Sequence, residues 1–95
     1  MGETKTNLFT VILEWAGGTY ITQVSAESPE RARALWVKKI KRGNNGLALS
    51  ARASIGKSLI DSDVVAIRGC KSVYCATSVV NKKLALVNII RTDAK

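Results

Sequence analysis

The side chains of this protein that could do chemistry are few, and none of them forms a catalytic pattern. The sequence contains no His, so the commonest general base and every His-dependent triad are missing. Asp61 and Asp63 are the only close pair of carboxylates, and they flank a turn, where Asp commonly stabilises the backbone. Residues 51–58 end in Gly-Lys-Ser like a phosphate-binding loop, but Ala51 stands where that loop needs a Gly. We therefore expect a protein that is not an enzyme.

Cys70 and Cys75 are the only cysteines, and more than one interpretation of them stays open. If they share one strand, their i, i+5 spacing points them to opposite faces, which disfavours a local disulfide. Two buried free thiols that act as small hydrophobic side chains is the favoured interpretation. A redox pair or half of an intersubunit metal site is the alternative. With no His in the chain, a zinc site would need carboxylates, so we expect no metal and no cofactor.

The strongest pattern in the chain is a basic helix over residues 28–43. Ser28 is a typical N-cap, Pro29 suits the first helical position, and Gly43 suits the end of the helix. Apolar residues at helical spacing predict one buried face, made of Ala32, Leu35, Trp36 and Ile40 with Val37 and Lys39 at its margins. The remaining surface of the helix is strongly basic.

These basic residues are the candidate binding site. The chain has 15 Lys and Arg against 7 Asp and Glu, a formal net charge of +8, and more than half of that excess lies on the predicted helix. A positive surface of this kind attracts phosphate backbones; a solvated helix face that only keeps the protein in solution is the alternative. Most of the few aromatic residues fall on apolar faces, so we expect phosphate contacts rather than base stacking. The candidate residues are Arg31, Arg33, Lys38, Lys39, Lys41, Arg42, Lys82 and Lys83.

The elements around the helix indicate an α+β fold. Alternating apolar residues predict strands at 7–15 and 19–26, joined by a turn at Ala16-Gly17-Gly18. Residues 47–60 have mixed propensity and are interpreted as a partly helical crossover after a loop at 44–46. Further strands are expected at 64–68, 71–80 and 84–91, the last two joined by a turn at Asn81-Lys82-Lys83.

The predicted architecture is a two-layer sandwich. A mainly antiparallel sheet of about five strands, in the order ββα-(α)-βββ, carries one main helix on one face. We expect a single domain over residues 1–95, with frayed tails at 1–6 and 92–95. An open sheet leaves two edges, so homodimerisation is plausible.

The beginning of the chain, a strand, Gly17-Gly18, a strand with Tyr20 and then a helix, resembles small antitoxins of the HicB type. Those proteins insert a further strand before the helix and carry acidic residues where this chain has Arg and Lys. The resemblance covers roughly a third of the chain and assigns no site residue.

We predict a small, basic, non-enzymatic module that contacts the phosphate backbone of nucleic acid without sequence preference. The alternative is a protein-interaction module, such as a regulator, an inhibitor or an immunity or antitoxin-like factor, that binds an acidic partner or adds a strand at a sheet edge. A redox role of the cysteines is a third, weaker hypothesis. The apolar runs are too short to span a membrane and residues 1–5 lack signal-peptide features, so we expect a cytoplasmic protein with no membrane partner.

Overall fold

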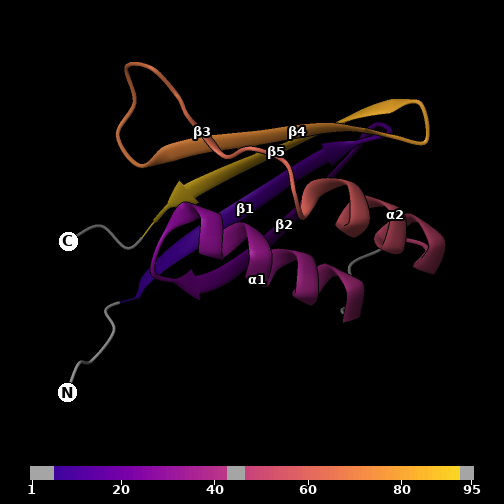
Figure 1. The fold of residues 1–95 in the computed structure, drawn as a ribbon, viewed down its shortest axis with the longest axis horizontal. Coiled ribbons are helices and arrows are strands. Elements are labelled where there is room, and N and C mark those ends of the chain that lie inside the picture. Colours follow the sequence, from indigo (N-terminus) through magenta and orange to yellow (C-terminus); the bar gives the residue numbers. More distant parts are fainter. Residues whose placement is uncertain (1–5, 43–46, 93–95) are drawn as a thin grey trace.

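The computed structural model describes residues 6–42 and 47–92 (Figure 1). Within them the chain forms one antiparallel sheet, in the spatial order β2-β1-β5-β4-β3, and two helices. The elements are β1 (Asn7–Trp15), β2 (Gly18–Ala26), α1 (Pro29–Arg42), α2 (Leu49–Leu59), β3 (Val65–Ala66), β4 (Val73–Val80) and β5 (Lys83–Arg91). The predicted α+β sandwich is confirmed, with two helices packed on the sheet instead of one main helix.

The turn between β1 and β2 is shorter than predicted. Trp15 lies opposite Gly18, so Ala16 and Gly17 alone make the turn and Gly18 begins β2. The φ angles of Ala16 and Gly17 are 52° and 82°, the positive values of a type I′ turn, whose twist matches that of the flanking strands. Ala in this left-handed region costs about 1–2 kcal/mol relative to a right-handed conformation.

Replacing Ala16 by Asn is therefore expected to raise the free energy of unfolding by about 0.5–1 kcal/mol, because Asn adopts the left-handed conformation more readily. Urea denaturation followed by circular dichroism measures the change. Ala16→Val is the matched control: its β-branched side chain is poorly tolerated there, so it should lower the stability. Equal midpoints for all three proteins would contradict the left-handed turn.

The centre of the sheet joins the first strand to the last. β1 pairs with β2 on one side and with β5 on the other, with Phe9 opposite Arg91. The Thr92 backbone N–H donates to the Leu8 carbonyl oxygen at an N–O distance of 2.8 Å. Thr92, the first residue of the predicted tail at 92–95, thus pairs with β1. The rest of the two predicted tails, residues 1–5 and 93–95, lies outside the described residues, and Thr6 precedes β1.

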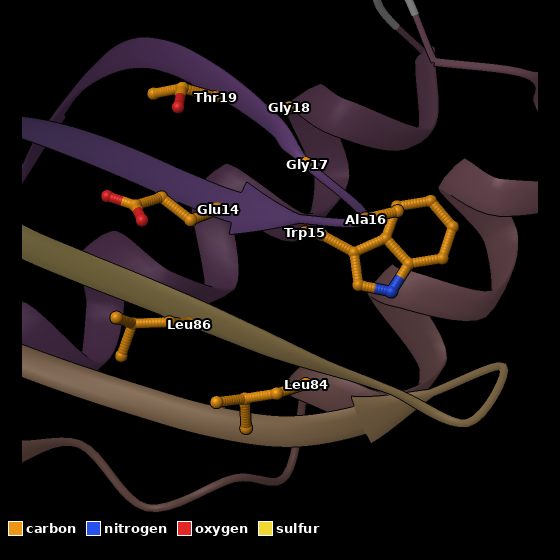
Figure 2. A pocket seen from close by; sticks show the side chains of 8 residues that line it. All are labelled: Glu14, Trp15, Ala16, Gly17, Gly18, Thr19, Leu84 and Leu86. Carbon is orange, nitrogen blue, oxygen red and sulfur yellow. The ribbon is translucent and has the colours of Figure 1, made fainter.

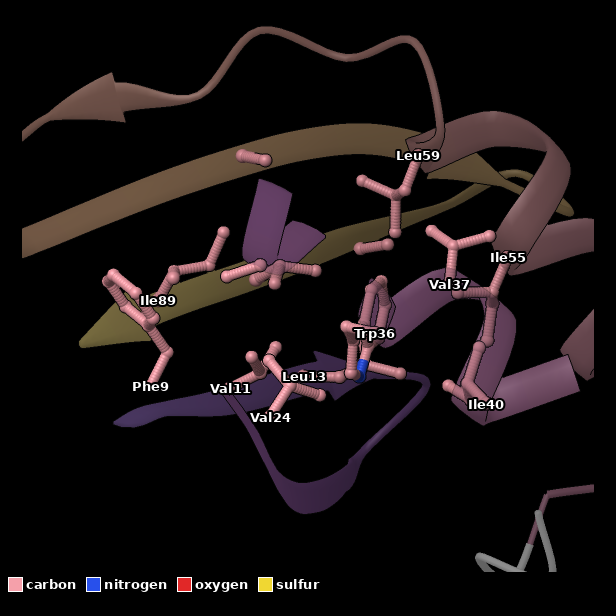
Figure 3. Close-up of a cluster of buried hydrophobic side chains, with 14 of the residues drawn as sticks. Phe9, Val11, Leu13, Val24, Trp36, Val37, Ile40, Ile55, Leu59 and Ile89 are labelled. Atoms are coloured by element: carbon pink, nitrogen blue, oxygen red, sulfur yellow. The ribbon is translucent and has the colours of Figure 1, made fainter. Parts of the chain in front are cut away.

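The core lies between the sheet and the two helices. Trp36 of α1 is buried near the middle of the cluster beside Leu13 of β1, and Ile89 of β5 lies next to Phe9 at one end of it (Figure 3). The buried stripe of α1 includes Val37, which was predicted at the margin, whereas Leu35, predicted as part of the face, is half-buried. The stripe thus lies slightly further round the helix than the sequence pattern indicated.

Residues 47–60 are more regular than predicted. α2 is a continuous helix of 11 residues, and Ala51, Ile55 and Leu59 recur at i, i+4 and i+8 on its buried side. This spacing gives α2 one apolar stripe, and burial of that stripe outweighs the weak helix propensity of its Gly and Ser residues. The predicted loop at 44–46 and the helix stop at Gly43 lie outside the described residues.

The strands of the second half also differ in their bounds. β3 contains only two residues, and β4 begins two residues later than predicted. A turn at Arg68 and Gly69 and a bend at Lys71 and Ser72 separate them, and Gly69 and Ser72 have φ angles of 85° and 60°. Asn81 and Lys82, both with positive φ, make the last turn, so Lys83 belongs to β5 rather than to the turn.

The cysteines are not the two buried thiols that the sequence suggested. Both are free; Cys70 is exposed in the turns between β3 and β4, and Cys75 is half-buried. Cys75 lies on the side of β4 opposite buried Ala76, so it faces away from the helices. Because Cys70 lies outside β4, the two residues do not share one strand, as the argument from their spacing assumed.

Candidate nucleic-acid interface

Three of the predicted basic residues lie together on the outer side of α1. Arg31, Lys38 and Arg42 occupy positions i, i+7 and i+11, which fall within about 40° of one another around an α-helix. They lie opposite the buried stripe, and all three side chains are exposed. Within the described part of the chain, no acidic side chain forms an ion pair with them. We call Arg31, Lys38 and Arg42 the basic ridge.

The start of α1 fixes where the basic ridge points. The backbone N–H of Arg31 donates to the Ser28 hydroxyl oxygen at 3.1 Å, so Ser28 is the N-cap that the sequence predicted. Glu30 lies in the first turn, and Lys39, Lys41 and Arg42 lie in the last turn. These charges stabilise the helix because they interact favourably with its dipole at both ends. Part of the positive charge of α1 therefore contributes to the stability of the helix.

Lys39 and Lys41 flank the basic ridge on its two sides. The ammonium of Lys39 donates to the Gln23 carbonyl oxygen at 2.8 Å, which ties α1 to the edge strand β2. On the other side, the stem of Lys41 lies against Gly56 of α2, where an added Cβ would be 2.8 Å from Lys41 Cε. Both side chains remain exposed, so they add to the positive field while also holding α1 to its neighbours.

Arg33 has a different place from the other candidates. Its guanidinium donates a hydrogen bond to the Ser62 carbonyl oxygen, and its Nε is buried with no hydrogen-bond partner among the described residues. The side chain thus holds the segment after α2 against α1. The structure places Arg33 inside the helical layer, away from the basic ridge.

Lys82 and Lys83 form a separate pair. Both are exposed at the turn between β4 and β5. In Figure 1, α2 lies between this turn and the end of α1. The predicted set of eight residues therefore divides into the basic ridge, its two flanking lysines, one internal arginine and this distant pair.

Lys57 is a basic residue of the helical layer that the predicted set missed. It is exposed on the side of α2 opposite the stripe of Ala51, Ile55 and Leu59. The Gly-Lys-Ser sequence around it drew attention only as a phosphate-binding loop. That segment lies inside α2, where its backbone cannot wrap a phosphate. The helical spacing of Ala51, Ile55 and Leu59 was the signal that could have placed Lys57 on the exposed side of a helix.

A hollow of about 410 Å³ lies beside the basic ridge, between α1 and the edge strand β2. Leu35 and Val24 contribute apolar surface to it, and Lys39 and Arg42 contribute positive charge. An apolar surface next to two cations suits a ligand that carries a flat or apolar group beside a phosphate.

A second hollow, of about 310 Å³, lies at the turn between β1 and β2 and has a different character (Figure 2). Glu14 is its charged residue, and Leu84 and Leu86 line its other side. Figure 2 shows the Trp15 ring pointing away from the Glu14 carboxylate; the indole N–H donates to the Val80 carbonyl oxygen at 3.0 Å. The lining contains one carboxylate and the Thr19 hydroxyl, and no second acid or base that could act together with Glu14.

Two further features are absent from the described residues. No helix within 6–42 and 47–92 combines the length and the apolar character that crossing a membrane requires. Across the same residues, no three His, Cys, Asp or Glu side chains gather where they could hold a metal ion.

The arrangement was compared with known proteins. Family models, curated protein sequences and solved structures give no match to this chain. The resemblance of the first hairpin and helix to HicB-type antitoxins is thus not accompanied by a match, and the candidate interface rests on its own geometry.

Proposed function

We propose that this protein is a small, non-enzymatic module that binds the phosphate backbone of nucleic acids through the outer surface of α1. The observation that supports it is the basic ridge: three exposed cations in one line, opposite the core, without acidic partners among the described residues. A helix surface that served only solubility would tolerate acids among its cations. The proposal places the protein in the cytoplasm, where nucleic acid is accessible.

The dimensions of the basic ridge suit a phosphate chain. Arg31 and Arg42 are 11 residues apart, which is about 16 Å along the helix axis, a length over which one strand of a duplex passes roughly five phosphates. Arg and Lys contacts to phosphate position a protein without reading sequence. We therefore propose binding without strong sequence preference, with Lys39, Lys41 and Lys57 adding to the field.

The test is fluorescence anisotropy with labelled single- and double-stranded oligonucleotides. Three phosphate contacts predict that, between ~50 and ~200 mM salt, the affinity falls roughly 40-fold for the double-stranded oligonucleotide and roughly 20-fold for the single-stranded one. The triple variant Arg31→Glu, Lys38→Glu, Arg42→Glu should bind roughly 100-fold more weakly at ~50 mM salt, because each contact is replaced by repulsion.

The matched control carries the same change of net charge elsewhere. In Lys71→Glu, Lys82→Glu, Lys83→Glu all three positions are exposed and lie outside the helices. This variant should keep most of the affinity if the basic ridge is the site. An equal loss in both triple variants would mean that only the net charge matters, and no binding by the unaltered protein at ~50 mM salt would reject the proposal.

A further inference from the structure

The face of the sheet turned away from the helices is apolar. At the strand positions that alternate with the buried ones, most residues are hydrophobic, whereas a solvated sheet face is typically polar at these positions. All four of the large hydrophobic side chains that the described residues expose lie there: Ile21 at 66%, Val65 at 55%, Val79 at 66% and Leu84 at 61% exposure. We call this surface the open face.

Cations are missing from the open face. No Lys or Arg occupies its strand positions, although the chain has 15 of them, and Glu14 is its one charged residue, near the β1–β2 turn. Two copies of a protein with a net charge of +8 repel each other through most surfaces. The open face is where two copies can approach without bringing basic side chains together. The same absence makes it a poor surface for nucleic acid or for an acidic protein.

Three polar side chains of the open face are hydrogen-bonded to one another. The Gln23 amide donates to the Thr10 hydroxyl at 3.1 Å, and the Thr10 and Thr92 hydroxyl oxygens are 2.9 Å apart. Polar groups that already have partners lose little when water is removed from them. Covering this face therefore buries its apolar residues, and these three polar groups add little to the cost.

The area of the open face is close to what a stable dimer needs. Four strands spaced about 4.8 Å apart, with roughly 3.3 Å per residue over nine residues, span about 19 by 30 Å, a footprint of about 570 Å². Because the side chains project from the plane of the sheet, the solvent-accessible area is larger than this footprint. A standard interface buries about 800 Å² on each partner.

We propose that the open face is the interface of a homodimer in which a second copy of this chain packs sheet against sheet. The two copies would be related by a two-fold axis, so that the same patch serves on both sides. The inner side chains would interdigitate as in a β-sandwich, with the helices on the two outer surfaces. The edge strand β2 is a poorer site for pairing, because Lys39 already binds the Gln23 carbonyl there.

Sedimentation equilibrium tests the proposal directly. The unaltered protein should have twice the 10.2 kDa mass of one chain. Ile21→Lys and Val79→Lys each bring two like charges into the interface of a two-fold dimer and should give monomers. Both positions are exposed within one chain, so circular dichroism should show the folded protein. Ala53→Lys puts the same charge on the exposed side of α2 and should remain dimeric.

The cysteines provide a second readout in the unaltered protein. Cys75 lies on the open face and Cys70 outside it, so alkylation followed by peptide mass spectrometry should show Cys70 modified much faster than Cys75 at dimer concentrations. Ile21→Lys should raise the Cys75 rate several-fold and leave the Cys70 rate unchanged.

The proposal is overturned if the unaltered protein is a monomer up to ~1 mM, or if both lysine variants remain dimers. The basic ridge lies on the other side of the molecule, so its triple variant should dimerise normally. Failure of oligonucleotide binding therefore leaves the dimer untouched, and the two proposals fail separately.

Discussion

Replacing Trp36 by Ala is expected to lower the free energy of unfolding by about 3–5 kcal/mol. Trp36 is the largest fully buried side chain, with 1% exposure, and it fills the space where α1 faces the sheet (Figure 3). Its removal leaves a cavity that the surrounding β-strands cannot close. Since domains of this size are stable by only about 5–15 kcal/mol, a large fraction of the variant should be unfolded under mild denaturing conditions. Urea denaturation followed by circular dichroism gives the change.

Leu35→Ala is the matched control, because Leu35 lies next to Trp36 in α1 but is only half-buried. It should lower the stability by about 1 kcal/mol, in proportion to the apolar area that it buries. If the two variants were equally destabilised, the position of the buried stripe of α1 would be wrong.

Replacing Gly56 by Leu is expected to lower the free energy of unfolding by about 1–3 kcal/mol, although Leu favours the helix over Gly by up to about 1 kcal/mol. Gly56 is the point where α2 lies against α1. A Cβ there would be 3.3 Å from Val37 Cγ1 and 2.8 Å from Lys41 Cε. The Lys stem can move, but the rest of a Leu side chain must push the two helices apart. Thermal denaturation of both proteins measures the loss.

Lys57→Leu makes the comparison on the neighbouring residue, whose side chain points to solvent. That variant should stay within about 0.5 kcal/mol of the unaltered protein. If Gly56→Leu instead stabilised the protein by its gain in helix propensity, the two helices could not be in close contact at Gly56.

The sequence was enough for elements whose signal is local. The alternation around β1 predicted the buried Phe9, Val11 and Leu13, and Ser28 and Pro29 predicted the start of α1. In β5 both sets of alternate positions are mainly apolar, and each also contains polar residues: Asn88 in one set, Lys83 and Arg91 in the other. Because these signals conflict, the strand alone does not show that Ala85, Val87 and Ile89 face the core. That choice depends on which side of the sheet the helices occupy.

The prediction of the candidate site from the sequence was also limited, because the sequence does not show which elements pack against one another. Charge alone selected Arg33 together with Arg31. At 3.6 residues per turn, Arg33 lies on the side of α1 that holds Val37 and Ile40, and what packs against it there depends on the tertiary structure. Here the residues after α2 fold back, and the Ser62 carbonyl accepts a hydrogen bond from Arg33. Conversely, Lys57 was missed because the regular stripe of α2 was obscured by Gly and Ser residues.

The pairing of β1 with β5 decides how the sheet can be assembled. Suppose that the ends of β5 and β1, which lie side by side, were joined and the chain were opened between α1 and α2. The order would become α2, β3, β4, β5, β1, β2, α1, and every pair of neighbouring strands would be consecutive in a simple meander. The longest-range contacts of the sheet would then be local, so the contact order would fall and folding should be faster. In the natural order, the central β1–β5 pair cannot form until β5, the last strand of the chain, is in place.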